Sequence, residues 1–223
     1  MKKNRGLFIT GTDTGVGKTY VASGVASALK QRGGNVGVMK PVETGCPVRA
    51  GRMKPNDALR LKAGAGTRDS LRLINPYRFK QPLAPAVAAE LDGRKIDIRV
   101  LLDAYRELQS RHEFLIIESA GGIMVPLRDT FTFLDLAVML GLPVLIVARP
   151  GLGTINHTLL TCEVLKKKKL SLAGIVISHT TTSKDGLAER TNPSVIGNMR
   201  RGAMPVILPH GSKDFDPIIA LIE

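Results

Sequence analysis

The 223-residue sequence predicts an α/β fold, in which a doubly wound, mostly parallel sheet carries helices on both faces. Short, unbroken apolar runs alternate with segments whose apolar residues recur every three or four positions. A glycine-rich stretch follows the first apolar run and opens the first helical segment, which is where such sheets carry a phosphate-binding loop. We therefore expect a single domain over residues 1–223, of the phosphate-loop nucleoside triphosphatase (NTPase) type.

Five short apolar runs are expected to be strands, because strands buried on both faces have no polar alternation. They are 6–10, 35–40, 113–118, 143–148 and 172–177. The expected helices are 18–31, 98–111, 132–141 and 154–168. The helical spacing is clearest in 98–111, through Ile98, Leu101, Leu102, Tyr105 and Leu108. Two proline-containing stretches, 41–55 and 75–86, are expected to be long loops beside a site.

The composition is that of a folded globular protein, with 43% hydrophobic and 23% charged residues. No apolar run reaches the roughly 20 residues of a membrane helix. The apolar stretch near the start of the sequence is too short for the core of a signal peptide. Two cysteines cannot build a disulfide framework. We expect a cytoplasmic protein without a membrane partner.

The charge is strongly positive, with 32 Lys and Arg against 19 Asp and Glu, a net charge of +13. Such an excess favours anionic partners, for example nucleotides or carboxylates. The densest block, Lys166–Lys169, ends an expected helix, where lysines complement the helix dipole. Three Tyr, six Phe and no Trp offer little base stacking. No nucleic-acid partner is expected.

The segment from Gly11 to Thr19, GTDTGVGKT, has the features of a phosphate-binding loop. Its backbone N–H groups can surround phosphate oxygens, Lys18 can neutralise the β- and γ-phosphates, and Thr19 can offer its hydroxyl to Mg²⁺. Five residues separate Gly11 from Gly17, one more than in the common pattern, so the loop is stretched.

Two further side chains are expected in the same crevice, because ligands bind beyond the carboxyl ends of parallel strands. Glu118 ends an expected strand and supplies a second acidic group near a metal. Lys40 ends another, and a second lysine can stabilise charge that develops in phosphoryl transfer. Asp57 follows as an acidic residue early in a helix.

The motifs Thr10–Thr19 and Lys40–Gly45 together resemble those of the dethiobiotin synthetase family. The likeness continues in matching order through the segments 56–58, 75–77, 118–122, 129–133 and 155–157. The resemblance implies an ATP- and Mg²⁺-dependent ring closure. One amine of 7,8-diaminononanoate takes up carbon dioxide or bicarbonate as a carbamate, which attacks the γ-phosphate of ATP. The second amine then displaces phosphate from the mixed anhydride and closes the cyclic urea.

The resemblance also implies roles for individual residues. Lys18, Lys40 and Thr14 would act at the reacting groups, and Thr19, Asp57 and Glu118 would hold Mg²⁺. The nucleotide would be bound by Gly15, Val16, Gly17, Lys18, Thr19, Tyr20, Asp57, Glu118, Ser178, His179, Leu208, Pro209 and His210. The substrate would be bound by Thr44, Gly121, Gly122, Leu152, Gly153 and Thr154. The family forms homodimers in which the substrate carboxylate reaches the facing subunit, here near residues 151–154.

This sequence departs from the family pattern at the expected base-reading positions. Ser178-His179 stands where the family usually has Asn-Asp, and Leu208-Pro209-His210 stands where it has Ile-Pro-aromatic. Gly15 stands where many relatives carry an acidic residue. Serine alone cannot offer the paired donor and acceptor of an asparagine amide. A tolerance of nucleotides other than ATP is therefore a hypothesis.

Two alternatives remain at this point. An amidoligase of the cobyrinic-acid type has a similar loop, but usually adds a glutaminase domain for which 223 residues leave no room. A partition-type ATPase that binds DNA would suit the positive charge. Its loop usually has an early signature lysine, and residues 13–17 here, DTGVG, contain none.

Overall fold

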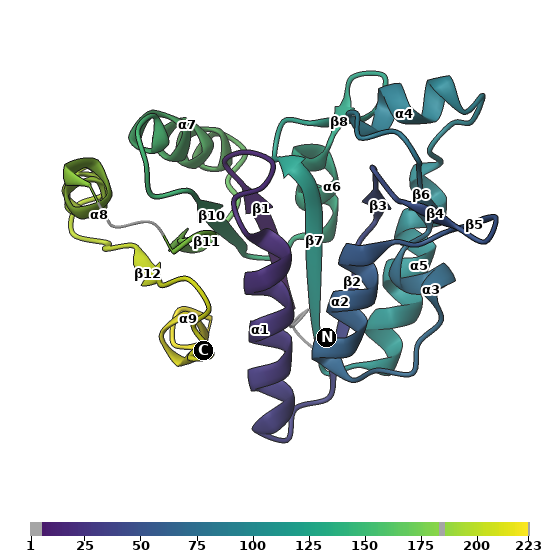
Figure 1. The fold of residues 1–223 in the computed structure, drawn as a ribbon, viewed down its shortest axis with the longest axis horizontal. Helices are drawn as coiled ribbons and strands as arrows, with labels where there is room; N and C mark the ends of the chain where they lie inside the picture. The colour runs from purple at the N-terminus through teal and green to yellow at the C-terminus, as the bar shows by residue number, and fades with distance from the viewer. Residues whose placement is uncertain (1–5, 183–185, 223) are drawn as a thin grey trace.

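The computed structural model describes residues 6–182 and 186–222. Over these residues the main sheet has six strands, all paired in parallel, in the order β12-β11-β10-β1-β7-β2 (Figure 1). The strands are β1 (Gly6–Gly11), β2 (Val36–Met39), β7 (Phe114–Gly122), β10 (Val144–Ala148), β11 (Leu172–Ser178) and β12 (Val206–Leu208). The predicted α/β class is confirmed. The single domain expected over 1–223 stays a prediction.

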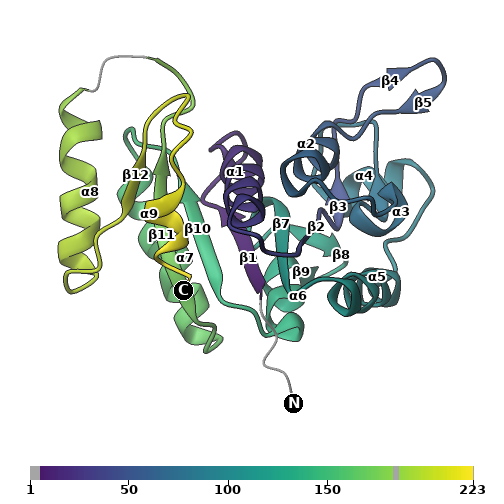
Figure 2. The same cartoon turned by 90° about the horizontal axis from the view of Figure 1, so that it is seen from below.

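Helices cover both faces of the sheet (Figure 2). On one face lie α1 (Lys18–Gln31), α2 (Asn56–Ala65) and α9 (Asp216–Ile219), and on the other α5 (Ile98–Arg111), α6 (Phe133–Leu140) and α7 (Thr154–Lys167). The strands divide their side chains between two hydrophobic cores: Phe8 of β1 packs with α6, while Leu7 and Ile9 pack under α1. This alternation follows from the pleat of a β-strand.

Helix α8 and several short elements complete the described chain. They are α3 (Leu71–Ile74), α4 (Pro85–Leu91), α8 (Leu187–Met199), and the strand pairs β3 (Val42–Glu43) with β6 (Tyr77–Arg78), β4 (Val48–Arg49) with β5 (Arg52–Met53), and β8 (Pro126–Arg128) with β9 (Phe131–Thr132). None of the described helices is long and apolar enough to cross a membrane.

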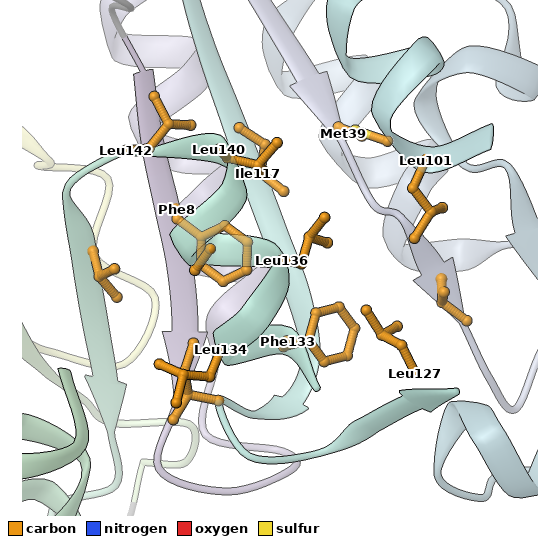
Figure 3. Close-up of a cluster of buried hydrophobic side chains, with 14 of the residues drawn as sticks. Phe8, Met39, Leu101, Ile117, Leu127, Phe133, Leu134, Leu136, Leu140 and Leu142 are labelled. Carbon is orange, nitrogen blue, oxygen red and sulfur yellow. The ribbon is translucent and has the colours of Figure 1, made fainter. Parts of the chain in front are cut away.

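Helix α6 packs against β1 in the hydrophobic core on one face of the sheet (Figure 3). Thr132 and Asp135 form a capping box that starts the helix, and Phe133, Leu136 and Leu140 are buried in the same cluster as Phe8. Burying each of these large side chains stabilises the fold by about 1.5–3 kcal/mol. The helix therefore holds β1 in place, and with it the loop that follows β1.

The predicted helices 18–31 and 98–111 are confirmed at both ends, and α6 and α7 lie within the predicted 132–141 and 154–168. Leu102, predicted for the apolar face of α5, is only partly buried. The stretches 41–55 and 75–86 were predicted to be loops, which is wrong in part, because they contain the short strands β3 to β6 and the start of α4. β3 and β6 pair across about 35 residues of sequence, whereas β4 and β5 form a local hairpin.

Strand β7 runs to Gly122, four residues beyond its predicted end at 118. Ile9 pairs with Glu118 and Gly11 with Gly122, so the register shifts between the two pairs. Extra residues on one strand of a pair bend it and redirect its side chains. The irregularity lies beside the phosphate-binding loop, at the carboxyl ends of the strands, where the candidate site is.

Candidate functional site

A cavity of about 850 Å³ opens at the carboxyl ends of β1, β2, β7 and β11. Most of the predicted site residues line this one space: Thr14, Gly15, Gly17, Lys18, Thr19, Tyr20, Lys40, Thr44, Asp57, Glu118, Gly121, Ser178, His179 and His210. They come from segments far apart in the sequence. The parallel sheet brings them together because the carboxyl ends of its strands all lie on this side.

The loop between β1 and α1 has the backbone that its glycines permit. Gly15 and Gly17 have positive φ angles of 76° and 94°, and Gly17 is the residue that precedes α1. A Cβ on Gly17 would lie 2.6 Å from Ser178 Oγ, so β11 closes tightly against the loop. The Lys18 ammonium donates to the carbonyl of Asp13 at 2.8 Å and thus lies over its own loop. Free N–H groups at the start of α1 suit an anion.

A charged cluster forms the floor of the cavity. Lys40 Nζ lies 2.5 Å from Glu118 Oε1 and 3.1 Å from Asp57 Oδ2. The Thr19 hydroxyl donates to the same Glu118 oxygen at 2.8 Å. Lys40 and Glu118 are 2% and 0% exposed, so the lysine is fixed between two carboxylates. The other Glu118 oxygen, Oε2, is buried without a hydrogen-bond partner.

The cluster shifts the pKa values of its members. Burial, aided by the charge of Lys40, lowers the pKa of Lys18 to about 8. Burial also acts to lower the pKa of Lys40, but Glu118 and Asp57 outweigh it and the pKa is raised. Burial acts to raise the pKa of Asp57, and Lys40 outweighs it, so the pKa is lowered. Asp57 is therefore a carboxylate at neutral pH, ready to face a cation.

These residues suit a magnesium ion. The Thr19 hydroxyl and the carboxylates of Asp57 and Glu118 are the hard oxygen donors that Mg²⁺ prefers, and the unpartnered Glu118 Oε2 leaves an acceptor open. Within the described residues there is no group of three or more His, Cys, Asp and Glu side chains placed to hold a metal.

Seven predicted residues do not line the cavity. Val16 is buried behind the loop, Gly122 follows Gly121 on β7, and Leu208 is buried with its carbonyl accepting from His179 N at 3.0 Å. Pro209 is exposed. At the start of α7, Leu152 is 82% exposed, while the Thr154 side chain is fully buried. Leu152, Gly153 and Thr154 form a separate location outside the cavity.

Sequence reasoning missed several lining residues. They are Glu43, Arg60, Pro82, Leu83, Ala84, Pro85, Ala120, Val125, Thr180 and Gly211. Arg60 lies over the Tyr20 ring at 5.7 Å, and the Tyr20 hydroxyl donates to the carbonyl of Ser212. Glu43 lies between the predicted site residues Lys40 and Thr44, and this position in the motif is the signal from which it could have been predicted as a site residue.

Cys46 and His112 are potentially reactive side chains, but their surroundings are structural. Burial raises the pKa of the Cys46 thiol to about 12, which keeps it protonated and unreactive. His112 is bound between Asn35 and Asp69 at 2.7 and 2.6 Å, at the opposite end of the sheet from the cavity.

Comparison with known proteins shows consistent likenesses. The family described as an AAA domain matches residues 5–204. The chain is 43% identical over 212 residues to the ATP-dependent dethiobiotin synthetase BioD of Thermodesulfovibrio yellowstonii, covering 92% of this chain and 88% of the relative. It is 48% identical over 181 residues to the protein of the same name from Anaeromyxobacter dehalogenans (81% and 79%), and 44% identical over 193 residues to that of Bacillus velezensis (86% and 81%).

Among solved structures, the chain resembles a ParA family ATPase from Chlorobium tepidum. The TM-score is 0.53 at 16% identity, and the match covers 100% of this chain and 89% of that one. At this identity the likeness concerns the fold alone.

Proposed function

The chain belongs to the family of ATP-dependent dethiobiotin synthetases, and on that premise we propose how its own residues perform the reaction. It is an ATP-dependent ligase that forms carbon–nitrogen bonds. We assign it 7,8-diaminononanoate and carbon dioxide or bicarbonate as substrates, and dethiobiotin, ADP and phosphate as products. The partition-type ATPase and the amidoligase are not supported, because the three relatives described above, at 43–48% identity, all bear the synthetase name.

The observation that carries the proposal is the meeting of Lys18 and Lys40 in one cavity beside a phosphate-binding loop. The reaction brings two anions together, a carbamate and a triphosphate, and two ammonium groups offset their repulsion. Lys40 is held by Glu118 and Asp57 rather than left mobile. It is therefore oriented before the substrates arrive, which is the condition under which a charge stabilises a transition state most.

The proposed reaction has three steps. One amine adds to carbon dioxide and loses a proton, giving the carbamate. A carbamate oxygen attacks the γ-phosphorus, and the bond from that phosphorus to the β–γ bridging oxygen breaks to release ADP. The second amine attacks the carbamate carbon, phosphate leaves, and a proton is lost as the ring closes. We place Lys18 and Lys40 at the transferring phosphoryl group, with Thr14 and Thr44 on the diamine side.

The proposed magnesium ligands are Thr19, Asp57 and Glu118. When bound, the ion neutralises phosphate charge. The protein's part is to keep Asp57 ionised through Lys40 and to hold the Thr19 hydroxyl against Glu118 at 2.8 Å. The nucleotide base is assigned to the wall that contains Tyr20, His179 and His210.

We propose that the enzyme acts as a homodimer, with the substrate carboxylate at the facing subunit's 151–154 segment. Leu152 is 82% exposed there, and the first turn of α7 has N–H groups suited to an anion. Because the reaction consumes ATP, we place the protein in the cytoplasm.

The test is phosphate release from Mg-ATP and bicarbonate, with and without 7,8-diaminononanoate, with the product identified by mass spectrometry. We expect release that depends on the diamine, with one cyclic urea formed for each phosphate. Hydrolysis that ignores the diamine, or no hydrolysis, would contradict the proposed reaction.

A further inference from the structure

Helix α2, which carries the proposed metal ligand Asp57, begins without a cap of its own. The residue before the helix is Pro55, and no side chain at that position accepts a hydrogen bond. The first N–H groups of a helix need partners when they are buried, and a proline offers none. Another part of the chain therefore has to supply the acceptor.

Glu43 supplies it from 14 residues earlier in the sequence. Its Oε1 accepts from the N–H of Asp57 at 3.0 Å, and its Oε2 accepts from the N–H of Ala58 at 2.9 Å. These are the second and third residues of the helix, the positions that an N-cap side chain normally reaches. Both carboxylate oxygens are thus used on one helix end, and the residue is 5% exposed.

The segment that carries Glu43 is itself fixed. The Glu43 carbonyl accepts from Phe79 N at 2.9 Å, and the Lys40 carbonyl accepts from the Asn75 amide at 2.8 Å. The same segment therefore contacts Asp57 twice. Lys40 holds its carboxylate at 3.1 Å, and Glu43 holds its backbone.

The rest of α2 is held independently. A Cβ on Gly64, near the end of the helix, would overlap the Ser23 carbonyl oxygen of α1, so the two helices are in close contact there. Removing the Glu43 carboxylate would therefore release the first turn of α2 while its last turn stays in place. Asp57 lies in that first turn.

We propose that Glu43 is a positioning residue for Asp57. It caps α2 from outside and thereby sets where the Asp57 carboxylate stands relative to Thr19 and Glu118. Glu43 lines the cavity, but both of its carboxylate oxygens are bonded to the amides at the start of α2. The inference depends on the proposed function, since it assumes that Asp57 is a ligand of the divalent cation.

The test uses the folded enzyme with a non-hydrolysable ATP analogue and Mn²⁺, whose binding is followed by electron paramagnetic resonance. For Glu43→Ala we expect the Mn²⁺ dissociation constant to rise by about tenfold or more, the usual effect of removing a group that orients a metal ligand. Glu43→Gln keeps one carbonyl acceptor and should fall between Glu43→Ala and the unaltered enzyme. Hydrogen exchange at the Asp57 and Ala58 amides should be about fivefold faster in Glu43→Ala.

The matched control is Asp97→Ala. Asp97 caps α5, accepting from Arg99 N at 2.9 Å, and does not line the cavity. This variant loses a carboxylate cap as well, so it should lower the melting temperature and leave Mn²⁺ affinity unchanged. If Glu43→Ala bound Mn²⁺ as tightly as the unaltered enzyme, or if Asp97→Ala weakened it equally, the inference would be overturned.

The variant Asp57→Asn distinguishes the positioning role of Glu43 from the metal role of Asp57. Asp57→Asn should weaken Mn²⁺ binding. If it does and Glu43→Ala does not, the positioning role is wrong and the proposed metal site stands. If Asp57→Asn has no effect either, the metal role of Asp57 is wrong and the inference falls with it. Should Glu43→Ala fail to fold, Glu43→Gln carries the same comparison.

Discussion

Replacing Lys40 tests the proposed mechanism most directly, because this side chain has both a structural and a chemical role. Lys40→Ala leaves Glu118, which is fully buried, without its cation. Breaking a buried pair by removing one partner costs about 3–5 kcal/mol. Since the Asp57 side chain is 43% exposed and can be rehydrated, we expect the lower end, about 3 kcal/mol. Many domains survive such a loss, as their stability is about 5–15 kcal/mol.

The catalytic loss should be larger than the loss in binding. One oriented charge or donor at a transition state contributes about 10²–10³ in kcat. We therefore expect Lys40→Ala to lose ring-closing turnover by that factor while it still binds ATP. Lys40→Met keeps the length of the side chain and separates the effect of the missing charge from that of a cavity.

The assay is diamine-dependent phosphate release, with dethiobiotin formation measured by mass spectrometry and nucleotide binding measured separately by fluorescence. Denaturant unfolding of each variant identifies the fraction that is folded. Turnover close to that of the unaltered enzyme in folded Lys40→Ala would remove Lys40 from the mechanism. Loss of nucleotide binding in the same proportion as turnover would assign it to ground-state binding instead.

The remaining predictions concern the nucleotide. The pKa of Lys18 is about 8, below the value of 10.5 that it has in the unfolded chain. ATP affinity should therefore fall as the pH rises past 8, because this lysine loses its charge. A flat affinity profile between pH 7 and 9 would contradict this. Conversely, stability of the nucleotide-free protein should rise from pH 8 toward 10.5, where the unfolded chain binds more protons, as thermal unfolding can show. With Ser178-His179 in place of the family's Asn-Asp, kcat/KM for ATP, CTP and GTP should be comparable. A preference for ATP of about 10⁴, typical of a site that reads the base by hydrogen bonds, would reject relaxed specificity. Tyr20→Phe removes the hydrogen bond to the Ser212 carbonyl. It should lower the free energy of unfolding by about 1 kcal/mol, measured by denaturant titration, and weaken nucleotide binding, measured by fluorescence titration.

The sequence predicted the helices and the loop whose conformation depends on residues close together in the chain. Helices α1 and α5 have regular apolar spacing and were predicted to the residue, and the glycine-rich loop identified the cavity. Helix α8 was missed because Pro193 lies inside it and a proline normally ends a helical pattern. Strand β12 has three residues, too few to show a period.

The unpredicted part of the site depends on contacts between distant segments. Glu43 caps a helix that starts 13 residues later in the chain, and nothing at Pro55 indicates that a cap comes from elsewhere. Arg60 and Gly211 reach the cavity only because α2 and the segment after β12 pack on α1. Such contacts are decided by tertiary packing, and no single stretch of sequence contains them.

The segment after β12 closes the cavity from the far end of the chain. It supplies His210 and Gly211, and Phe215 packs so tightly on α1 that a Cβ on Gly24 would overlap its ring. During synthesis the phosphate-binding loop emerges well before the segment that follows β12. A nascent chain can therefore display the loop long before it can enclose a nucleotide. A chain without this segment would lack His210 and Gly211 of the cavity and Phe215 of the core, so it should retain nucleotide less well than one that carries it.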